Sequence, residues 1–279
     1  MTPLPSLAVT GSTGALGGLV ARGLADLGVP QRLLARTPAR APRLEGAVAV
    51  PFSFADREAA TAALRGAETL LMVSASESAD RLEAHRTFVD AAMAAGVQHL
   101  VYTSFLGAGP ACTFTLGRDH WATEEHIRSS GVRATFLRDN FYLDFLPDTV
   151  GTDGVIRGPA GDGRVSAVAR ADVARAAVAV LADPAAHAGA TYDLTGPEAL
   201  SLTEVAGTIA AATGGSVSYH DETIEEAYAS RRRWAAPDWQ YDAWVSTYTA
   251  IARDEVSRVS DDVERLTGQP PLTLAQLLG

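Results

Sequence analysis

Short apolar runs alternate with longer amphipathic stretches over the first half of the chain. The runs have the length and content of buried strands, and they lie at residues 6–10, 31–35, 47–50, 69–74, 99–104 and 133–138. Apolar positions recur with helical spacing over residues 15–27, 56–64, 80–95 and 119–130. This alternation predicts an α/β fold in which a parallel sheet is covered by helices on both faces.

Residues with special roles at helix ends support these boundaries. Asp56 and Asp80 stand where an N-cap is expected. A glycine able to form a left-handed cap follows the last apolar position of several predicted helices, at Gly28, Gly66, Gly96 and Gly131.

The regular alternation of strand-like and helix-like segments ends after residue 138. Residues 154–168 are rich in glycine and predict an excursion or a hairpin, and residues 169–184 predict a helix. A strand (191–196), a helix (202–214), a strand (216–221) and mostly helical sequence follow. The C-terminal part is therefore expected to be a smaller α+β cap.

Composition and charge narrow the range of partners and compartments. The chain has 279 residues, a formal charge of -10 and no lysine, so arginine supplies all 23 of its strongly basic side chains. Such an acidic balance argues against nucleic acid. Cys112 is the single cysteine, which excludes an intrachain disulfide and favours a reducing cytoplasm. The sequence MTPLPS lacks the features of a signal peptide, and no run of about 18 apolar residues predicts a membrane span.

A glycine-rich loop follows the first predicted strand, in LAVTGSTGALGG (residues 7–18). Glycines between a first strand and a first helix let the backbone approach a pyrophosphate at the positive end of the helix dipole. We therefore expect a dinucleotide-binding loop rather than a purely structural turn. A P-loop is excluded because it needs a lysine. The predicted ligands are Gly11, Ser12, Thr13, Gly14, Ala15, Leu16 and Gly17.

The end of the second predicted strand indicates which dinucleotide is bound. A carboxylate at this point suits the ribose of NAD, whereas an arginine suits the 2′-phosphate of NADP. QRLLAR ends in Arg36, and no acid occurs before Glu45. NADPH is thus the predicted cofactor, the alternative being that Arg36 is a solvated loop charge.

Aromatic residues gather late in the chain. They are Trp234, Trp239, Tyr241, Trp244 and Tyr248. Such a cluster either packs within the cap or forms a wall for an aromatic substrate.

Several motifs in a fixed order resemble one known family. They are VTGSTGALGG, LLAR, LLMVSAS, HLVYTS and FLRDNFY, with SDDVERLTGQPPLTLAQLL near the end. The chain resembles the NmrA-like branch of the atypical short-chain dehydrogenases/reductases, near the NAD(P)H:quinone oxidoreductase and triphenylmethane reductase group. The resemblance implies a doubly wound Rossmann domain over residues 1–150, which also receives the strand and helix segments around 165–195. A smaller substrate-binding domain mostly covers residues 151–279.

The resemblance also implies roles for residues beyond the glycine loop. It indicates cofactor contacts at Ser74, Ala75 and Thr103, and it locates Asn140 and Tyr142 beside the nicotinamide and the substrate. Family members carry an acid and an aromatic residue after the third strand, near the adenine. This chain has Ser53 and Phe54, so only the aromatic contact of Phe54 survives.

The catalytic pair of most short-chain dehydrogenases cannot form here. In the Tyr-x-x-x-Lys pair the lysine lowers the pKa of the tyrosine, and an arginine does not replace it. Ser104 does occupy the place of the usual catalytic serine, where it could contact the substrate or the nicotinamide ribose.

The helix that should carry this pair contains other candidates. His120 and Glu124 are four residues apart and share a helix face, so the carboxylate could orient the imidazole and raise its pKa. The alternative is a surface His120, with Glu124 paired to Arg128. Tyr142 could donate a proton, though inefficiently at an unperturbed pKa of about 10. We expect His126 to be structural and no metal to bind.

These observations predict an NADPH-dependent reductase of a small aromatic acceptor. Hydride transfer to a quinone-like, dye-like or polycyclic aromatic carbonyl acceptor needs less acid catalysis than reduction of a simple ketone. The predicted catalytic residues are His120, Tyr142 and Ser104. Two alternatives stay open: a polyketide ketoreductase in which a substrate phenol supplies the proton, and a non-catalytic NADP(H) sensor. We expect a cytoplasmic monomer or homodimer.

Overall fold

Seven strands form the central sheet of the computed structural model, which describes residues 3–279. Their order is β3-β2-β1-β4-β5-β6-β9. The strands are β1 (Leu7–Val9), β2 (Gln31–Ala35), β3 (Ala47–Pro51), β4 (Thr69–Met72), β5 (His99–Phe105), β6 (Arg133–Asp139) and β9 (Thr191–Leu194). Neighbouring strands from β3 to β5 pair in parallel; Val9, for example, lies opposite Leu33 on one side and Leu71 on the other.

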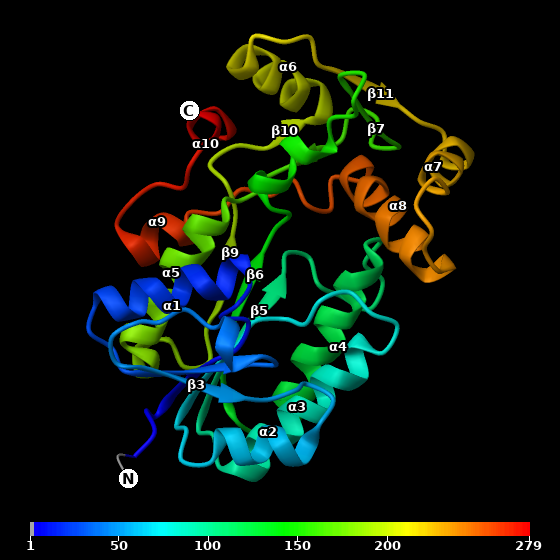
Figure 1. Cartoon of the computed structure of the whole chain (residues 1–279). Helices are drawn as coiled ribbons and strands as arrows, with labels where there is room; N and C mark the ends of the chain where they lie inside the picture. The colour runs from blue at the N-terminus through cyan, green and yellow to red at the C-terminus, as the bar shows by residue number, and fades with distance from the viewer. Residues whose placement is uncertain (1–2) are drawn as a thin grey trace. The chain divides into compact units, whose positions relative to one another are not determined.

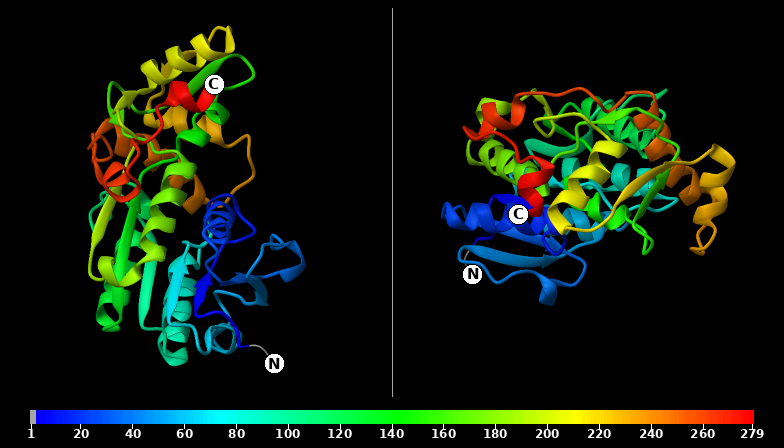
Figure 2. Two further views of the ribbon diagram at one scale, coloured as in Figure 1. Left: turned by 90° about the vertical axis from the view of Figure 1, so that its left-hand side faces the viewer. Right: turned by 90° about the horizontal axis from the view of Figure 1, so that it is seen from above.

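The strand order gives the sheet a doubly wound topology. Successive strands run outward from β1 to β3, and the chain then returns to the other side of β1 with β4. In such sheets the ligand crevice lies outside the carboxyl ends of the strands, where the order reverses. The predicted Rossmann fold is confirmed, and the left view of Figure 2 shows its strands side by side.

Helices from the first two thirds of the chain cover both faces of this sheet. They are α1 (Ala15–Asp26), α2 (Arg57–Leu64), α3 (Arg81–Ala95), α4 (Thr115–Ser129) and α5 (Arg170–Ala182). Figure 1 shows α1 and α5 on one face and α2, α3 and α4 on the other. α1 and α5 approach closely, because an added Cβ at Gly23 would lie 2.8 Å from the side chain of Val178.

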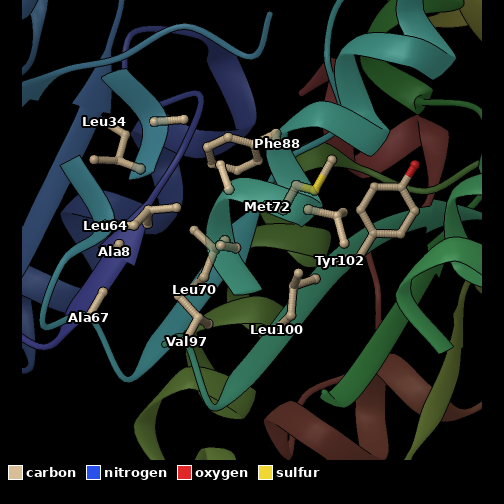
Figure 3. Close-up of a cluster of buried hydrophobic side chains, with 14 of the residues drawn as sticks. Ala8, Leu34, Leu64, Ala67, Leu70, Met72, Phe88, Val97, Leu100 and Tyr102 are labelled. Carbon is tan, nitrogen blue, oxygen red and sulfur yellow. The ribbon is translucent and has the colours of Figure 1, made fainter. Parts of the chain in front are cut away.

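A buried apolar cluster fills the space between the sheet and α2, α3 and α4. Phe88 from α3, Leu64 from α2 and Ile127 from α4 pack on strand residues such as Leu70 and Tyr102. Figure 3 shows this cluster, in which the hydroxyl group of Tyr102 points away from the apolar side chains beside it. Tyr102 therefore brings a polar group to the rim of an otherwise apolar core.

The predicted boundaries agree closely with the structure, with one exception. Gly28, Gly66, Gly96 and Gly131 all have φ between +69° and +84°, as left-handed caps require. Asp56 caps α2 by accepting from the N–H of Ala59, whereas Asp80 precedes α3 without a side-chain cap. α4 begins at Thr115, four residues before the expected start. Gly117 made this first turn hard to predict from the sequence. Glycine is needed at this position because a Cβ would lie 2.6 Å from Sγ of Cys112.

The chain divides into two compact units. The first comprises the residues up to Ser104, Asp119–Arg138 and Val173–Tyr192. The second comprises Phe105–Arg118, Asp139–Asp172 and Asp193–Gly279. The central sheet thus belongs to the first unit except for the last residues of β5, β6 and β9.

The second unit contains two small sheets and most of the late helices. Its strands are β7 (Val155–Gly158), β8 (Arg164–Val165), β10 (Leu200–Ser201) and β11 (Ser218–Asp221). β7 pairs in parallel with β11, and β8 pairs antiparallel with β10. The hairpin alternative for residues 154–168 is therefore wrong. Each of its strands finds a partner from later in the chain.

Helices from the last third of the chain complete the second unit. They are α6 (Leu202–Thr213), α7 (Ile224–Arg231), α8 (Asp238–Ala252), α9 (Asp262–Thr267) and α10 (Leu274–Leu278). Single 3-10 turns occur in both units, at Pro38–Arg40 and Pro184–His187 in the first and at Leu143–Phe145 and Pro147–Thr149 in the second. No helix within residues 3–279 combines the length and hydropathy needed to cross a membrane.

Candidate cofactor and active site

The glycine loop makes a tight turn between β1 and α1. Gly11 has φ +67°, a conformation that favours glycine, and the N–H of Gly14 donates to the carbonyl oxygen of Gly11 at 2.8 Å. A Cβ at Gly17 would overlap that same carbonyl group. Glycine at these positions lets the first turn of α1 sit directly on the loop.

The loop has the features of an anion site. Gly14 is the N-cap of α1, so no side chain caps the first amides, and the first turn carries no acidic residue. Ser12 is buried, and its Oγ has no hydrogen-bond partner within residues 3–279. A buried hydroxyl group without a partner is costly unless a ligand satisfies it. The loop therefore fits a pyrophosphate, with Thr13 and Ala15 exposed beside it and Leu16 anchored in the core.

Two arginines of the segment QRLLAR have different surroundings. Arg32 is buried in β2 and donates to the carbonyl groups of Pro5, Ala63 and Arg65. Arg36 follows β2 directly and is exposed, and its side chain makes no hydrogen bond or ion pair with the residues that the structure describes. Arg36 is thus free to bind a phosphate group, as NADP binding requires.

Phe54 is half-buried in a group of aromatic rings. Its ring centroid lies 5.1 Å from that of Phe52, 4.8 Å from that of Phe88 and 6.0 Å from that of His85. The predicted adenine contact of Phe54 can use only the remaining exposed part of the ring.

The loop after β4 is held by side chains rather than by backbone pairing. The N–H of Val73 donates to Oγ1 of Thr10 at 2.8 Å, and that of Ser74 donates to Oγ1 of Thr103 at 2.9 Å. The N–H of Ala75 donates to Nε2 of His85 at 2.9 Å. The structure thus brings the predicted residues Ser74 and Thr103 together. Because the N–H of Ser74 is engaged, a cofactor contact of Ser74 can use only its carbonyl or side-chain oxygen, whereas the carbonyl oxygen of Ala75 already accepts from Nε of Arg81 at 2.9 Å.

Ser104 and Glu124 belong to a buried ionic cluster. Oγ of Ser104, which is fully buried, donates to Oε1 of Glu124 at 2.5 Å. Arg138 donates to both carboxylate oxygens of Glu124, at 2.9 and 2.7 Å, and Arg128 adds a bond at 2.8 Å. Burial raises the pKa of Glu124, but these hydrogen bonds outweigh it and lower the pKa below its ordinary value.

The expected pairing of His120 with Glu124 is therefore wrong. The bidentate guanidinium group of Arg138 and the Arg128 side chain take the carboxylate. His120 is buried instead, with Nε2 at 2.9 Å from Nη2 of Arg81 and Nδ1 at 3.0 Å from the hydroxyl oxygen of Tyr102. Burial and the charge of Arg81 hold the pKa of His120 well below its ordinary value, so the expected rise is also wrong.

His126 lies elsewhere on α4. It is partly exposed, and its Nε2 lies 2.8 Å from Oδ1 of Asp90 on α3. No group of three or more His, Cys, Asp or Glu side chains within residues 3–279 could hold a metal ion.

Asn140 and Tyr142 belong to the second unit, and their polar atoms are engaged there. Nδ2 of Asn140 donates to Oγ of Ser166 and to the carbonyl oxygen of Val256, both at 2.9 Å. The hydroxyl group of Tyr142 donates to Oδ2 of Asp139 at 2.5 Å. Burial and the neighbouring Asp139 raise the pKa of Tyr142 well above 10, so the expected unperturbed value is wrong.

The late aromatic residues also lie in the second unit. Trp244 packs against Trp234 and Tyr241, with ring centroids 6.0 and 5.7 Å away. Trp234 is nevertheless 47% exposed. Packing within the cap accounts for part of this cluster and leaves an aromatic surface on Trp234.

Sequence reasoning missed Arg81, His85 and Tyr102. Arg81 and His85 are four residues apart on α3 and share its buried face with Phe88 and Val89. A charged and a titratable residue on an otherwise apolar helix face is the signal that could have identified them.

Comparisons with known proteins agree with this arrangement. Residues 11–184 match the family described as NAD(P)H-binding. Quinone oxidoreductase 2 of Escherichia coli is 33% identical over 97% of this chain and 96% of its own.

Solved structures extend the likeness to the whole fold. The NADPH complex of the NADPH-dependent quinone oxidoreductase QOR2 of E. coli has a TM-score of 0.89 at 32% identity, and the alignment covers 98% of each chain. Triphenylmethane reductase of Citrobacter sp. has a TM-score of 0.86 at 30% identity, again over 98% of each chain. The transcriptional regulator NmrA shares the fold alone, at 18% identity and a TM-score of 0.78.

These likenesses confirm the predicted kinship with the NmrA-like quinone and dye reductase group, the NAD(P)H class of cofactor and the oxidoreductase class of enzyme. The chain belongs to the NAD(P)H-binding family.

Proposed function

We propose that this chain is an NADPH-dependent reductase of quinone-like, dye-like or polycyclic aromatic carbonyl acceptors. NADPH, when bound, supplies a hydride to the acceptor. The names of the E. coli and Citrobacter relatives support this acceptor class, and the exposed Arg36 after β2 supports NADPH over NADH.

One observation carries the proposal: each candidate proton donor is already committed to a partner. Ser104 donates to Glu124, and Tyr142 donates to Asp139 with a pKa raised well above 10. His120 is buried between Arg81 and Tyr102, where burial lowers its pKa. No lysine is present to tune a tyrosine.

An acceptor that suits such a site needs little acid catalysis. Hydride transfer to a quinone gives a delocalised anion that solvent can protonate afterwards, and hydride transfer to a cationic dye gives a neutral product that needs no proton. Reduction of a simple ketone would leave a localised alkoxide that needs a positioned acid. The chain's own contribution is then to hold and orient the two reactants.

We assign the cofactor contacts to the first unit. The loop residues Gly11–Gly17 bind the pyrophosphate, Arg36 binds the 2′-phosphate and Phe54 touches the adenine. Ser74 and Ala75 border the nicotinamide half, with Thr103 supporting them from β5.

We assign most acceptor contacts to the second unit, with Trp234 as an exposed aromatic surface. Tyr142 and Asn140 shape this region through their bonds to Asp139 and Ser166. Within the first unit, Ser104 and His120 act as orienting groups rather than as acids.

A panel of acceptors tests the proposal. The purified chain is assayed for NADPH oxidation with naphthoquinones, triarylmethane dyes, polycyclic aromatic ketones and, as a control, an aliphatic ketone, with NADH in parallel. Turnover of the aromatic acceptors with a preference for NADPH is expected. Turnover confined to the aliphatic ketone, or tight NADPH binding with no turnover, would overturn it; the latter result would favour a sensor.

A further inference from the structure

The two backbone groups of Ala75 are both held by side chains of α3. Its N–H donates to Nε2 of His85 at 2.9 Å, and its carbonyl oxygen accepts from Nε of Arg81 at 2.9 Å. Both side chains are buried. This single peptide after β4 is therefore fixed at two points from one helix.

The contacts determine where the histidine protons lie. Because a backbone N–H donates to Nε2 of His85, that nitrogen carries no proton, and the proton is on Nδ1. Nδ1 of His85 lies 3.0 Å from Oγ1 of Thr123, which donates in turn to the carbonyl oxygen of Asp119. His85 is thus neutral and can only support the loop.

The same reasoning fixes His120. A guanidinium group has no acceptor atom, so Nε2 of His120 must accept from Nη2 of Arg81. The proton of the neutral imidazole is then on Nδ1, facing the hydroxyl oxygen of Tyr102 at 3.0 Å. Figure 3 shows the side chain of Tyr102 with its hydroxyl group directed away from the apolar cluster.

The buried position of Arg81 is unfavourable for a charged side chain. Its side chain is 4% exposed, the nearest carboxylate oxygen, on Asp119, lies 3.6 Å from Nη1, and Nη1 has no hydrogen bond within residues 3–279. A buried cation with incomplete partners destabilises the fold, so the contribution of Arg81 to the protein is sought outside stability. Its two complete bonds go to the loop after β4 and to His120.

We infer that Arg81 is a positioning residue of the cofactor site, which holds the loop after β4 in its binding shape, and that His120 orients Arg81 as a hydrogen-bond acceptor. This inference rests on the proposed function, because it assumes that this loop borders NADPH. In this inference Nε2 of His120 accepts a hydrogen bond from Arg81, and His120 takes no part in proton transfer.

A pair of substitutions separates the two nitrogen atoms of His120. The side-chain amide of His120→Gln reaches the position of Nε2 and can still accept from Arg81. The shorter amide of His120→Asn reaches only the position of Nδ1. The matched control is His126→Gln, on the same helix but bonded to Asp90.

The experiment measures the dissociation constant of NADPH from its own fluorescence, together with kcat at saturating NADPH for a naphthoquinone. We expect His120→Asn to raise the dissociation constant about tenfold or more, since a charge-assisted hydrogen bond is lost. The control His126→Gln should stay within about threefold of the wild type in both its dissociation constant and its kcat, and His120→Gln should recover most of the NADPH affinity that His120→Asn loses.

Three results would overturn the inference while leaving the proposed function intact. One is wild-type NADPH affinity in both His120 variants. Another is an equal loss of affinity in both. The third is a large loss of kcat with unchanged affinity, which would make His120 a catalytic group. Failure of the wild type to bind NADPH would instead overturn the proposed function.

A second variant covers the case in which His120→Asn does not fold. Arg81→Lys keeps the positive charge, but one amine cannot reach both the carbonyl oxygen of Ala75 and Nε2 of His120. NADPH binding weakened about tenfold is expected despite the retained charge. Wild-type affinity in Arg81→Lys would show that the charge alone suffices and would contradict the inference.

Discussion

Two arginines four residues apart have identical side chains but different roles, because one is buried and the other is exposed. Arg32 points into the first unit and satisfies three carbonyl groups, so it stabilises the fold. Arg36 is exposed just beyond the carboxyl end of β2. At that point of a doubly wound sheet a guanidinium group can bind a 2′-phosphate with two hydrogen bonds.

Arg36→Ala should therefore weaken NADPH binding selectively. Loss of a charge-assisted contact of about 1.5–3 kcal/mol corresponds to a rise of roughly 10- to 150-fold in the dissociation constant. NADH affinity should hardly change. Fluorescence titration with both nucleotides measures this, with the exposed Arg65→Ala as a control. An equal effect on NADPH and NADH would refute the assignment of Arg36 to the 2′-phosphate.

At the scale of elements, the turn between β1 and α1 depends on close approach as much as on conformational freedom. Gly17 lies where any side chain would overlap the carbonyl group of Gly11. A substitution would push α1 away from the loop and shift the amides that face a pyrophosphate. Gly207, within α6, has nothing within 4 Å of its missing Cβ.

Gly17→Ala should thus abolish measurable NADPH binding and lower the melting temperature. Gly207→Ala should leave NADPH binding unchanged and stabilise α6 by up to about 1 kcal/mol, because alanine is the better helix former. Thermal unfolding and nucleotide titration of the two variants test this contrast. Wild-type NADPH affinity in Gly17→Ala would mean that the loop does not form the cofactor site.

The elements that carry the fold could be predicted because their signals are local. Strand residues 31–35 and the glycine cap at Gly96 follow from apolar periodicity and backbone conformation. The partners of the site residues could not, because they depend on packing between elements. Glu124 was expected to bind His120 from the next helical turn. Arg138, from strand β6, binds the carboxylate of Glu124 instead, because it donates to both of its oxygens.

At the scale of the whole molecule, buried neutral histidines make stability depend on pH. Burial and the charge of Arg81 hold the pKa values of His85 and His120 well below their ordinary value. As the pH falls below about 6.5, the unfolded chain binds protons that the folded chain does not, so stability decreases. At pH values well above about 6.5, these histidines are neutral in both the folded and the unfolded chain, so stability no longer depends on pH through them.

Each of these two histidines should lower the free energy of unfolding as the pH falls below about 6.5, by at most about 1.4 kcal/mol per pH unit. Urea unfolding at a series of pH values measures this slope. Replacing one titrating group, in His120→Gln, should make the slope smaller, by at most about 1.4 kcal/mol per pH unit. An unchanged slope in that variant would show that His120 is not held neutral in the folded chain.

The pH dependence of kcat for NADPH oxidation with a naphthoquinone tests most directly whether hydride transfer proceeds without a titrating side-chain acid. Neither His120, whose pKa is well below its ordinary value, nor Tyr142, whose pKa is well above 10, should titrate between about pH 6.5 and 8. We therefore predict turnover with a kcat that stays within about twofold across this range. Absence of turnover, or a titration near neutral pH that disappears in His120→Gln, would contradict the account.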